Sequence, residues 1–441
     1  MYYLIETQEQ LKRFFKDEGS ECYLQFVTNN DKVHPKLQKV CAYYIYSFSK
    51  EKGFIINIDH PEAFFIENST TYLQHYTNIF VKDKTRALTY IPNLPYTDIQ
   101  SIHYLVTNEA LPLTEKTGAH TFYEREYGAN NVNKIIPLSK HYEALEKEFN
   151  AIKSHIFNYQ PNDASKWYND IFIPTLAKLI DSGFKINDNF NKFFDINEKF
   201  NVFDSKIYGW YNYCTTTGRP TNNFNSINFS ALKHDNGERD SFEASNDVLI
   251  EMDFEGYHPR IIAHLIGYEI DKNESIHTQL AKIYFETKEV DDEMYKKSKE
   301  LTFRQMYGGI DKEYYKYEFF AKTKNFIDIL WQEFNTKGYV ETLIAKRRLL
   351  KCNYTNITPQ KLFNYYIQAF ETEYNFSLLY NIFKLLENKK SKIILYVYDS
   401  ILIDFSLEDG KELYQSIKKL ISTEFPIKVK QGIIYSSLKT V

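Results

Sequence analysis

Two aspartates stand where a carboxylate is costly unless it has a partner. Asp253 lies near the end of the apolar run VLIEMDF (248–254), and Asp399 separates the two apolar halves of KIILYVYDSILIDF (392–405). A carboxylate in apolar surroundings is unfavourable unless it is paired or binds a metal. Two carboxylates at adjacent strand ends can hold two divalent cations about 4 Å apart, an arrangement suited to phosphoryl transfer. Aspartate is also a common turn residue, so each position alone leaves both interpretations open.

A second group of residues repeats at helical spacing. Lys299, Phe303 and Tyr307 are four positions apart, which places them on one face of the helix predicted for residues 291–308. A cation followed by two aromatic rings can contact a phosphate, a sugar and a base in turn. The same spacing also fits an ordinary amphipathic helix with its rings in the core.

The elements that must position these residues can be predicted from the sequence pattern. Residues 248–254 predict a buried strand, and 258–267 (HPRIIAHLIG) predict a helix directly after it. Residues 392–405 predict a β-hairpin whose turn carries Asp399. Upstream, residues 1–140 indicate α/β structure, and residues 141–200 are mostly helical in pattern.

The composition is that of a globular chain. Of 441 residues, 43% are hydrophobic and 25% are charged, and Gly (15) and Pro (12) are scarce, which excludes disordered and collagen-like classes. The four cysteines have no CxxC spacing, which argues against a zinc site or a disulfide framework. There is no GxxxxGK[ST], GxGxxG, GxSxG or HExxH motif. No targeting signal or stretch of 18 apolar residues is present, so we expect no membrane partner and a cytoplasmic location.

Charge is unevenly distributed along the chain. The formal net charge is −4, which by itself disfavours a nucleic-acid partner. However, residues 1–300 hold 33 basic and 43 acidic residues, whereas residues 301–441 hold 21 basic and 15 acidic ones. The last third is therefore predicted to present a basic surface that can meet phosphates.

Together these residues resemble the polymerase module of family A DNA polymerases, the DNA polymerase I type, and most closely its phage-like members. The resemblance covers about residues 165–441 and rests on motifs in the family's order. The matching segments are TTTGRPTNNFNSIN (215–228), Gly237-x-Arg239-x-x-Phe242, DFEGYHPR (253–260), Ile276-His277-Thr278, KELTFRQMYG (299–308), GYVETL (338–343) with KRR (346–348), NYYIQ (364–368) and Tyr398-Asp399-Ser400.

The resemblance implies a role for each matching residue. Asp253 and Asp399 would be the catalytic carboxylates and, with Phe254, the ligands of two Mg²⁺ ions, for which Mn²⁺ can substitute. The implied nucleotide-binding residues are His258, His277, Lys296, Lys299, Phe303 and Tyr307. The implied primer–template-binding residues are Arg219, Asn225, Asn228, Arg260, Asn364, Gln368 and Tyr398.

The resemblance also implies an α+β architecture. We expect a right-hand polymerase with an antiparallel-sheet palm, helical fingers and a reduced thumb, preceded by an α/β RNase H-like exonuclease-type domain. The predicted domains are a vestigial 3′–5′ exonuclease-like domain (1–140), reduced thumb and connector helices (141–200), the first part of the palm (201–264), the fingers (265–345) and the second part of the palm (346–441).

The implied activity is template-directed addition of dNTPs to a primer 3′-OH by two-metal-ion phosphoryl transfer, in phage or plasmid-like DNA replication. The expected partners are primer–template DNA, dNTPs and a processivity or replisome protein, and a phage-encoded chain would act in the host bacterial cytoplasm. Two alternatives stay open. One is a catalytically silent polymerase-like subunit that binds primer–template, and the other is an RNA polymerase of the single-subunit type.

Departures from the family pattern sharpen these expectations. His258 stands where the family has the glutamate that excludes a ribose 2′-OH, and Tyr295 replaces a phosphate-binding arginine. Only 30 positions separate Asn187 from Thr217, where the family inserts a long helical hairpin, so we expect a shortened thumb and low processivity.

The predicted exonuclease-like domain also departs from the pattern. Thr28 and Asn30 occupy the positions of its defining Asp-x-Glu, while Asp98 and Tyr142-x-x-x-Glu146 resemble its later motifs. Because two-metal hydrolysis needs the missing carboxylates, we expect no proofreading.

Overall fold

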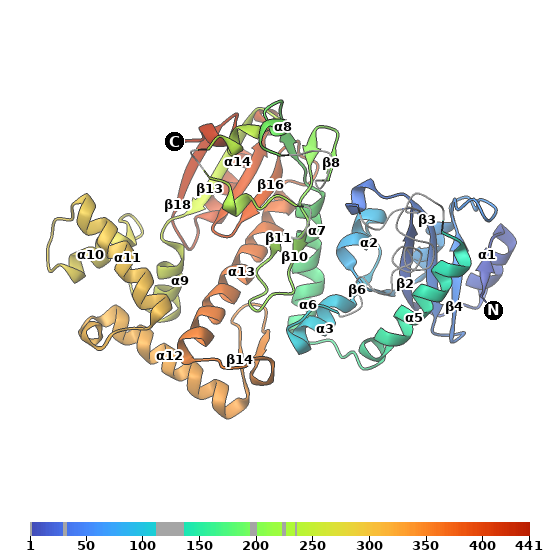
Figure 1. The fold of residues 1–441 in the computed structure, drawn as a ribbon, viewed down its shortest axis with the longest axis horizontal. Coiled ribbons are helices and arrows are strands. Elements are labelled where there is room, and N and C mark those ends of the chain that lie inside the picture. The colour runs from blue at the N-terminus through green and yellow to red at the C-terminus, as the bar shows by residue number, and fades with distance from the viewer. Residues whose placement is uncertain (1, 30–32, 112–135, 195–200, 223–225, 234–235) are drawn as a thin grey trace. The chain divides into compact units, whose positions relative to one another are not determined.

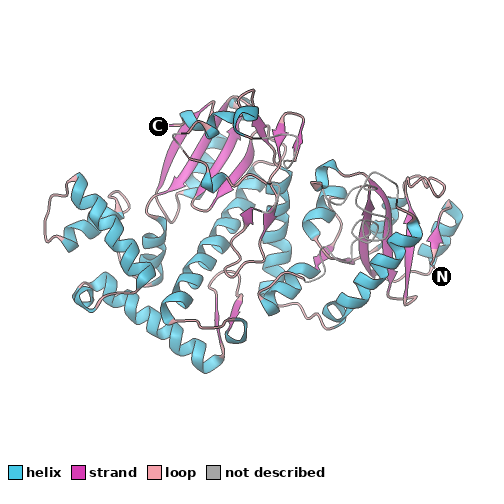
Figure 2. Cartoon of the chain, viewed as in Figure 1, coloured by secondary structure: helices cyan, strands magenta, loops and turns pink. Residues whose placement is uncertain are grey.

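The structure, a computed structural model, describes residues 2–29, 33–111, 136–194, 201–222, 226–233 and 236–441 (Figure 1). The chain divides into two compact units, Met1–Asp181 and Ser182–Val441. The first combines a mixed sheet with helices, and the second combines an antiparallel sheet with longer helices (Figure 2).

The first unit is built on a six-stranded sheet. In sheet order its strands are β1 (Leu4–Ile5), β4 (Lys52–Asn57), β3 (Val40–Ser47), β2 (Glu21–Thr28), β5 (Asn78–Val81) and β6 (Tyr96–Asp98). β2 pairs antiparallel with β3 and parallel with β5. The helices are α1 (Gln8–Lys16), α2 (Lys84–Tyr90), α3 (Ile99–Thr107), α5 (Leu138–Phe157), α6 (Asp163–Trp167) and α7 (Ile173–Asp181).

Helices cover both faces of this sheet. Successive side chains of a strand point to opposite faces. Accordingly, Cys22 and Leu24 of β2 belong to the core that includes Leu11 of α1, whereas Tyr23 belongs to the core that includes Phe149 of α5. This unit therefore has the α/β layering that the sequence predicts.

The second unit is centred on a five-stranded sheet in which every neighbouring pair is antiparallel. In sheet order its strands are β16 (Lys392–Val397), β17 (Ser400–Phe405), β13 (Val248–Phe254), β18 (Ile427–Gly432) and β19 (Lys439–Thr440). Three small sheets accompany it. They contain β7 (Phe184–Ile186), β8 (Val202–Phe203), β9 (Lys206–Ile207) and β12 (Phe242–Glu243); β10 (Tyr211–Asn212) and β11 (Thr221–Asn222); and β14 (Tyr339–Glu341) and β15 (Arg348–Leu350).

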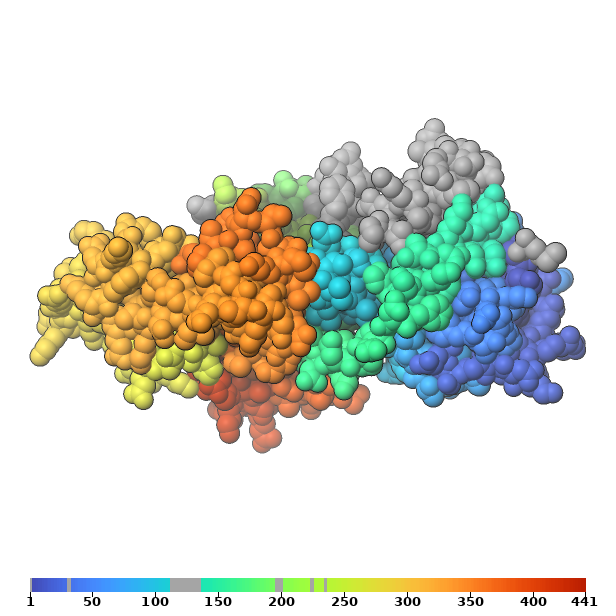
Figure 3. Space-filling view, turned by 90° about the horizontal axis from the view of Figure 1, so that it is seen from below, coloured from blue at the N-terminus to red at the C-terminus, as the bar shows by residue number. Residues whose placement is uncertain are grey.

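The helices described in the second unit include the two that the sequence predicts beside the site, α9 (Tyr257–Leu265) and α11 (Asp292–Gly308). The others are α8 (Phe190–Phe193), α10 (Ile276–Tyr284), α12 (Glu318–Lys337), α13 (Pro359–Leu385) and α14 (Gly410–Ile421). α12, coloured orange, lies on the surface of this unit (Figure 3).

Helix α13 connects the other parts of the second unit. It begins at Pro359, after Thr358 caps it by accepting a hydrogen bond from the Lys361 amide at 3.2 Å. It runs for 27 residues and buries side chains along its whole length, including Phe363, Phe370 and Phe376. It contacts α9, α11, α12 and α14. This helix is the framework on which the sheet and the α9–α12 helices are positioned.

Candidate active site

Strand pairing brings the two predicted catalytic aspartates together. Asp253 of β13 lies opposite Ser400 of β17, so Asp399 in the β16–β17 turn falls beside the end of β13. The Phe254 amide donates to the Asp399 carbonyl at 2.9 Å, which fixes the turn against that strand. These two residues, 146 positions apart in sequence, therefore meet where β13 ends and β16 turns into β17.

Both aspartates line a pocket of about 400 Å³ in the second unit. Ten of the residues predicted from sequence line it: Arg219, Asp253, Phe254, His258, His277, Lys299, Phe303, Tyr307, Tyr398 and Asp399. The strand ends supply the carboxylates, while α9, α10 and α11 supply the imidazoles, the amine and the rings. The pocket thus combines a metal-type oxygen donor set with cationic and aromatic groups.

The electrostatics of the two carboxylates fit a cation site. Burial, followed by the nearby charge of Asp399, raises the pKa of the Asp253 carboxyl to about 6. Burial is also the main reason that the pKa of Asp399 is raised. Two partly buried carboxylates, one of which raises the pKa of the other, are stabilised by a cation with oxygen preference, such as Mg²⁺. With the Phe254 main chain beside them, these residues fit the predicted metal site.

Helix α11 presents the predicted face to this pocket. Its Asp291 N-cap accepts from the Met294 amide at 2.8 Å and orders the first turn. The rings of Phe303 and Tyr307 are parallel within 5°, with centroids 5.9 Å apart. Lys299 lies one turn earlier on the same face and lines the pocket. The buried residues of α11 are Ser298, Thr302, Gln305 and Met306, whereas Lys299 is exposed and Phe303 and Tyr307 are half-buried, so this row is available to a ligand.

His277 is a neutral polar group in the wall of the pocket. It is 4% exposed. Burial, followed by the charge of Lys299, lowers the pKa of its imidazole to about 4. Its Nδ1 has no hydrogen-bond partner among the described residues. Since an unsatisfied buried nitrogen is costly, this atom is a natural contact for a bound molecule.

The remaining predicted residues lie outside this pocket. Lys296 and Asn228 are exposed, Asn364 and Gln368 are half-buried on α13, and Asn225 lies outside the described residues. Arg260 is 4% exposed. Its guanidinium donates to the Glu255 carbonyl at 3.0 Å and to the Glu274 carbonyl at 2.8 Å. In the structure Arg260 thus joins α9 to the segment before α10. Contact of Lys296 with the nucleotide, and of the other residues with primer–template, stays a prediction.

Three charged residues of the pocket were not predicted as site residues from the sequence. Glu255 after β13, Glu371 of α13 and Lys428 of β18 all line it. Glu371 is seven positions after Asn364 and three after Gln368, so helical spacing placed it on the face already implicated. Lys428 gave no comparable signal, because its place depends on the register of β18 against β13.

Comparisons with known proteins agree with the motifs. No family profile matches the chain. The chain is 26% identical over 249 residues to DNA polymerase I of Borreliella burgdorferi, which covers 49% of this chain and 27% of that relative. It is 25% identical over 269 residues to DNA polymerase I of Lactococcus lactis, covering 52% and 31%. Thermostable DNA polymerase I of Thermus aquaticus is 23% identical over 213 residues, covering 41% and 25%. The resemblance to DNA polymerase I is confirmed.

The fold comparison covers nearly the whole chain. The POL domain of Pol1 from M. smegmatis, solved in complex with DNA primer-template and dNTP, superimposes with a TM-score of 0.74 over 99% of this chain and all of that one, at 14% identity. This likeness confirms the predicted α+β polymerase-domain fold. The matched segments span only about a quarter to a third of the curated DNA polymerase I relatives. Among the described residues, none of the helices is long and apolar enough to cross a membrane.

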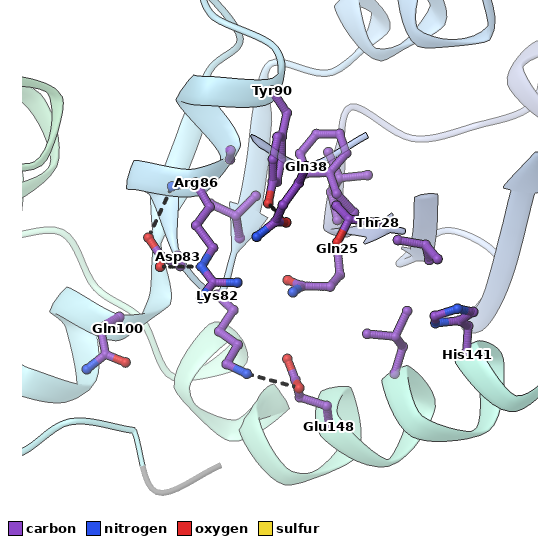
Figure 4. Close-up of a pocket in the computed structure, with 16 residues that line it drawn as sticks. Gln25, Thr28, Gln38, Lys82, Asp83, Arg86, Tyr90, Gln100, His141 and Glu148 are labelled. Carbon is purple, nitrogen blue, oxygen red and sulfur yellow. Dashed lines mark hydrogen bonds and ion pairs between the residues drawn. The ribbon is translucent and has the colours of Figure 1, made fainter. Parts of the chain in front are cut away.

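A second pocket lies in the first unit, at the carboxyl ends of the parallel strands β2 and β5 (Figure 4). Its acidic side chains are already engaged in ion pairs. Glu148 pairs with Lys82 at 3.0 Å, and Asp83 pairs with Arg86 at 3.4 Å. A carboxylate held by a protein cation is a poor ligand for a metal ion.

The carboxylates predicted from the exonuclease pattern do not line this second pocket. Asp98 is buried and accepts from the amides of Ser101 and Lys84, both at 2.7 Å. Glu146 accepts from the Tyr44 hydroxyl. Thr28 does line the pocket, and Asn30 lies outside the described residues. In the described part of the chain, no cluster of three or more potential metal ligands is present.

Proposed function

We propose that this chain is a template-directed DNA polymerase that adds dNTPs to a primer 3′-OH. The observation that carries the proposal is one pocket in which Asp253 and Asp399 meet the Lys299-Phe303-Tyr307 face of α11. The named relatives are DNA polymerases, and the solved neighbour binds primer-template and dNTP. The relatives and the solved neighbour both support primer–template DNA and dNTPs as the substrates.

In this proposal the two aspartates and the Phe254 carbonyl hold two Mg²⁺ ions, or Mn²⁺ in their place. When bound, such ions lower the pKa of an attacking hydroxyl and neutralise charge on the transferred phosphate. The primer 3′-oxygen attacks the α-phosphate of the dNTP, its proton is lost, and pyrophosphate leaves. The protein's other residues position the reacting groups.

The nucleotide is positioned by side chains on both sides of the pocket. Lys299 contacts the triphosphate as a cation, with His277 nearby as a neutral hydrogen-bonding group. Phe303 packs on the sugar, and Tyr307 lies at the base-pair position. His258 stands beside the 2′-carbon. Arg219, Asn364 and Gln368 meet the minor groove of the primer–template, where correct pairs share acceptors.

Primer extension tests this function. We expect purified protein to extend a primer with dNTPs and Mg²⁺, and Asp399→Ala to abolish extension while the protein still binds primer–template. If the wild type binds primer–template but extends nothing, the catalytically silent subunit is the correct function. If rNTPs are used as well as dNTPs, the single-subunit RNA polymerase alternative gains support.

The proposal gives each predicted domain its own role. The palm (201–264 and 346–441) and fingers (265–345) perform synthesis, the thumb region (141–200) is reduced, and the first 140 residues do not proofread. The ion pairs of Lys82 and Arg86 in the first unit support the last point. Metal-dependent shortening of a mismatched primer by purified protein would contradict it. Processive synthesis under single-hit conditions, without a partner protein, would contradict the reduced thumb.

A further inference from the structure

A buried glutamate lines the pocket that holds Asp253 and Asp399 and contacts two of the pocket's other residues. Glu371 of α13 is 1% exposed. One carboxylate oxygen accepts from Nη2 of Arg219 at 2.9 Å, and the other lies 3.1 Å from Nε2 of His258. A buried carboxylate with each oxygen assigned to a different active-site residue constrains both of them.

The ionisation of Glu371 determines that the Nε2 atom of His258 carries a proton. Burial alone would raise the pKa of this carboxyl, but His258 and Arg219 outweigh burial and hold it below its ordinary value. An ionised carboxylate only accepts hydrogen bonds, so the Nε2 of His258 must carry a proton. The other ring nitrogen, Nδ1, contacts the Tyr307 hydroxyl. The result is a chain of contacts from Tyr307 through His258 to Glu371.

The Glu371 oxygen that accepts from Arg219 extends these contacts toward the β16–β17 turn, which carries Tyr398 and Asp399. The Arg219 guanidinium, held by Glu371, lies 3.7 Å from the centre of the Tyr398 ring. One helical turn further along α13, the Asn375 amide donates to the Tyr398 carbonyl at 2.7 Å. Glu371 and Asn375 therefore fix neighbouring parts of the pocket from one rigid helix.

We propose that Glu371 is the positioning residue that holds His258 beside the nucleotide sugar, and that it thereby sets the preference for dNTPs over rNTPs. The proposal rests on the proposed polymerase function. An imidazole free to rotate about two bonds could move aside for a 2′-hydroxyl. An imidazole hydrogen-bonded at both nitrogens is fixed in one orientation and keeps that volume filled. The preference for dNTPs over rNTPs thus depends on Glu371, which acts through His258 and not by its own contact with the sugar.

A purely structural role for Glu371 would also be physically reasonable, because Arg219 needs a counter-charge. The two roles differ in one respect. A counter-charge for Arg219 affects both nucleotide types equally, whereas a residue that acts through His258 affects their ratio and loses that effect when His258 is removed. A double-mutant cycle separates these cases.

The experiment measures single-nucleotide insertion opposite dT with dATP and with ATP, and compares the two kcat/KM values. We expect Glu371→Gln to lower the dATP/ATP ratio by about tenfold, since a contact that discriminates between such substrates contributes a factor of this size. His258→Ala lowers the ratio at least as much. In the His258→Ala background, Glu371→Gln lowers it no further.

A matched control is available two positions away on the same helix, where the side chain points to another side. Glu373 is also a buried carboxylate of α13, but it accepts from the Ala345 amide at 2.9 Å and does not line the pocket. Glu373→Gln is expected to leave the dATP/ATP ratio unchanged. If Glu371→Gln does not fold, Glu371→Asp serves instead, because its shorter side chain keeps the charge but cannot reach both partners. The same fall in ratio is expected.

The outcomes distinguish this inference from the proposed function. A wild-type protein that inserts neither nucleotide defeats the polymerase proposal. An active wild type whose ratio is unaffected by Glu371→Gln and Glu371→Asp overturns the inference alone. Full additivity of the Glu371 and His258 effects also overturns it, because the two residues would then act independently.

Discussion

Lys428 lies directly opposite Asp253 in the antiparallel ladder between β18 and β13. Both residues line the proposed active-site pocket. The Lys428 amine is 3.3 Å from an oxygen of Glu255, and its side chain is 52% exposed. A lysine so placed can contact a triphosphate in the pocket.

We therefore predict that Lys428→Met raises the KM for dNTPs by about tenfold with a smaller change in kcat, because one charge-assisted hydrogen bond to a phosphate is lost. Steady-state primer extension measures both constants. Lys430→Met is the control, because Lys430 pairs with Glu251 at 2.7 Å and lies outside the pocket. Equal KM values for the wild type and Lys428→Met would rule out the contact.

The raised pKa of Asp253 predicts a pH-dependent cost in the metal-free protein. This pKa is about 6 in the folded chain, against an ordinary value of 3.8. Between these values the folded state binds more protons than the unfolded state, so the free energy of unfolding falls as pH rises through this window. At pH 7 the whole cost is present.

Asp253→Asn is accordingly expected to stabilise the metal-free protein at pH 7 by about 1 kcal/mol, once solvent screening of this partly exposed group is allowed for. The gain should shrink as pH falls toward 4. Urea unfolding in EDTA at several pH values measures it. Added Mg²⁺ should stabilise the wild type more than Asp253→Asn, and equal stabilisation of both would contradict the metal assignment.

The ion pair in the first unit predicts a large effect on stability. The Lys82 side chain is 13% exposed and that of Glu148 only 2%. Lys82→Met leaves a buried carboxylate without its cation and should cost about 3–5 kcal/mol of unfolding free energy. The double variant Lys82→Met/Glu148→Leu should recover most of this loss. Chemical denaturation of all three proteins measures the effect, and a double variant as unstable as the single one would show that the pair is not the cause.

Gly256 is expected to tolerate no side chain. It joins β13 to α9 with φ +56°, and a Cβ there would collide with the Ile276 side chain. Gly267 has a similar φ of +60° but nothing within 4 Å of its Cβ position. In both alanine variants the left-handed backbone is expected to lower the free energy of unfolding by about 1 kcal/mol. In Gly256→Ala, overpacking lowers it by about 1–3 kcal/mol more. Thermal unfolding should therefore show the larger loss for Gly256→Ala, and equal losses would exclude the collision.

Much of this site could be predicted because local patterns determine it. The apolar run before Asp253 formed β13, and the run around Asp399 formed the β16–β17 hairpin. The four-residue spacing of Lys299, Phe303 and Tyr307 was sufficient to place them on one face of α11. In each case the sequence pattern lies within one strand, one hairpin or one helix.

The charges that complete the pocket could not be predicted in the same way. Glu371 shares a helix face with Asn364 and Gln368, but its contacts with Arg219 and His258, 152 and 113 positions away, follow from no spacing rule. Lys428 enters the pocket through strand register, and a slip of one residue would turn it to the other face. Likewise, the sequence indicated α/β structure in residues 1–140 but not the pairing of Lys82 with Glu148, which depends on how α5 packs on the sheet.

The contact between His258 and Glu371 also restricts which side chains fit at position 258. A glutamate stands at this position in the family pattern that the sequence resembles. In this structure a glutamate there would face the buried Glu371 carboxylate, and like charges in a buried site repel strongly. His258→Glu is therefore expected to be unfavourable in this chain unless residue 371 is changed as well.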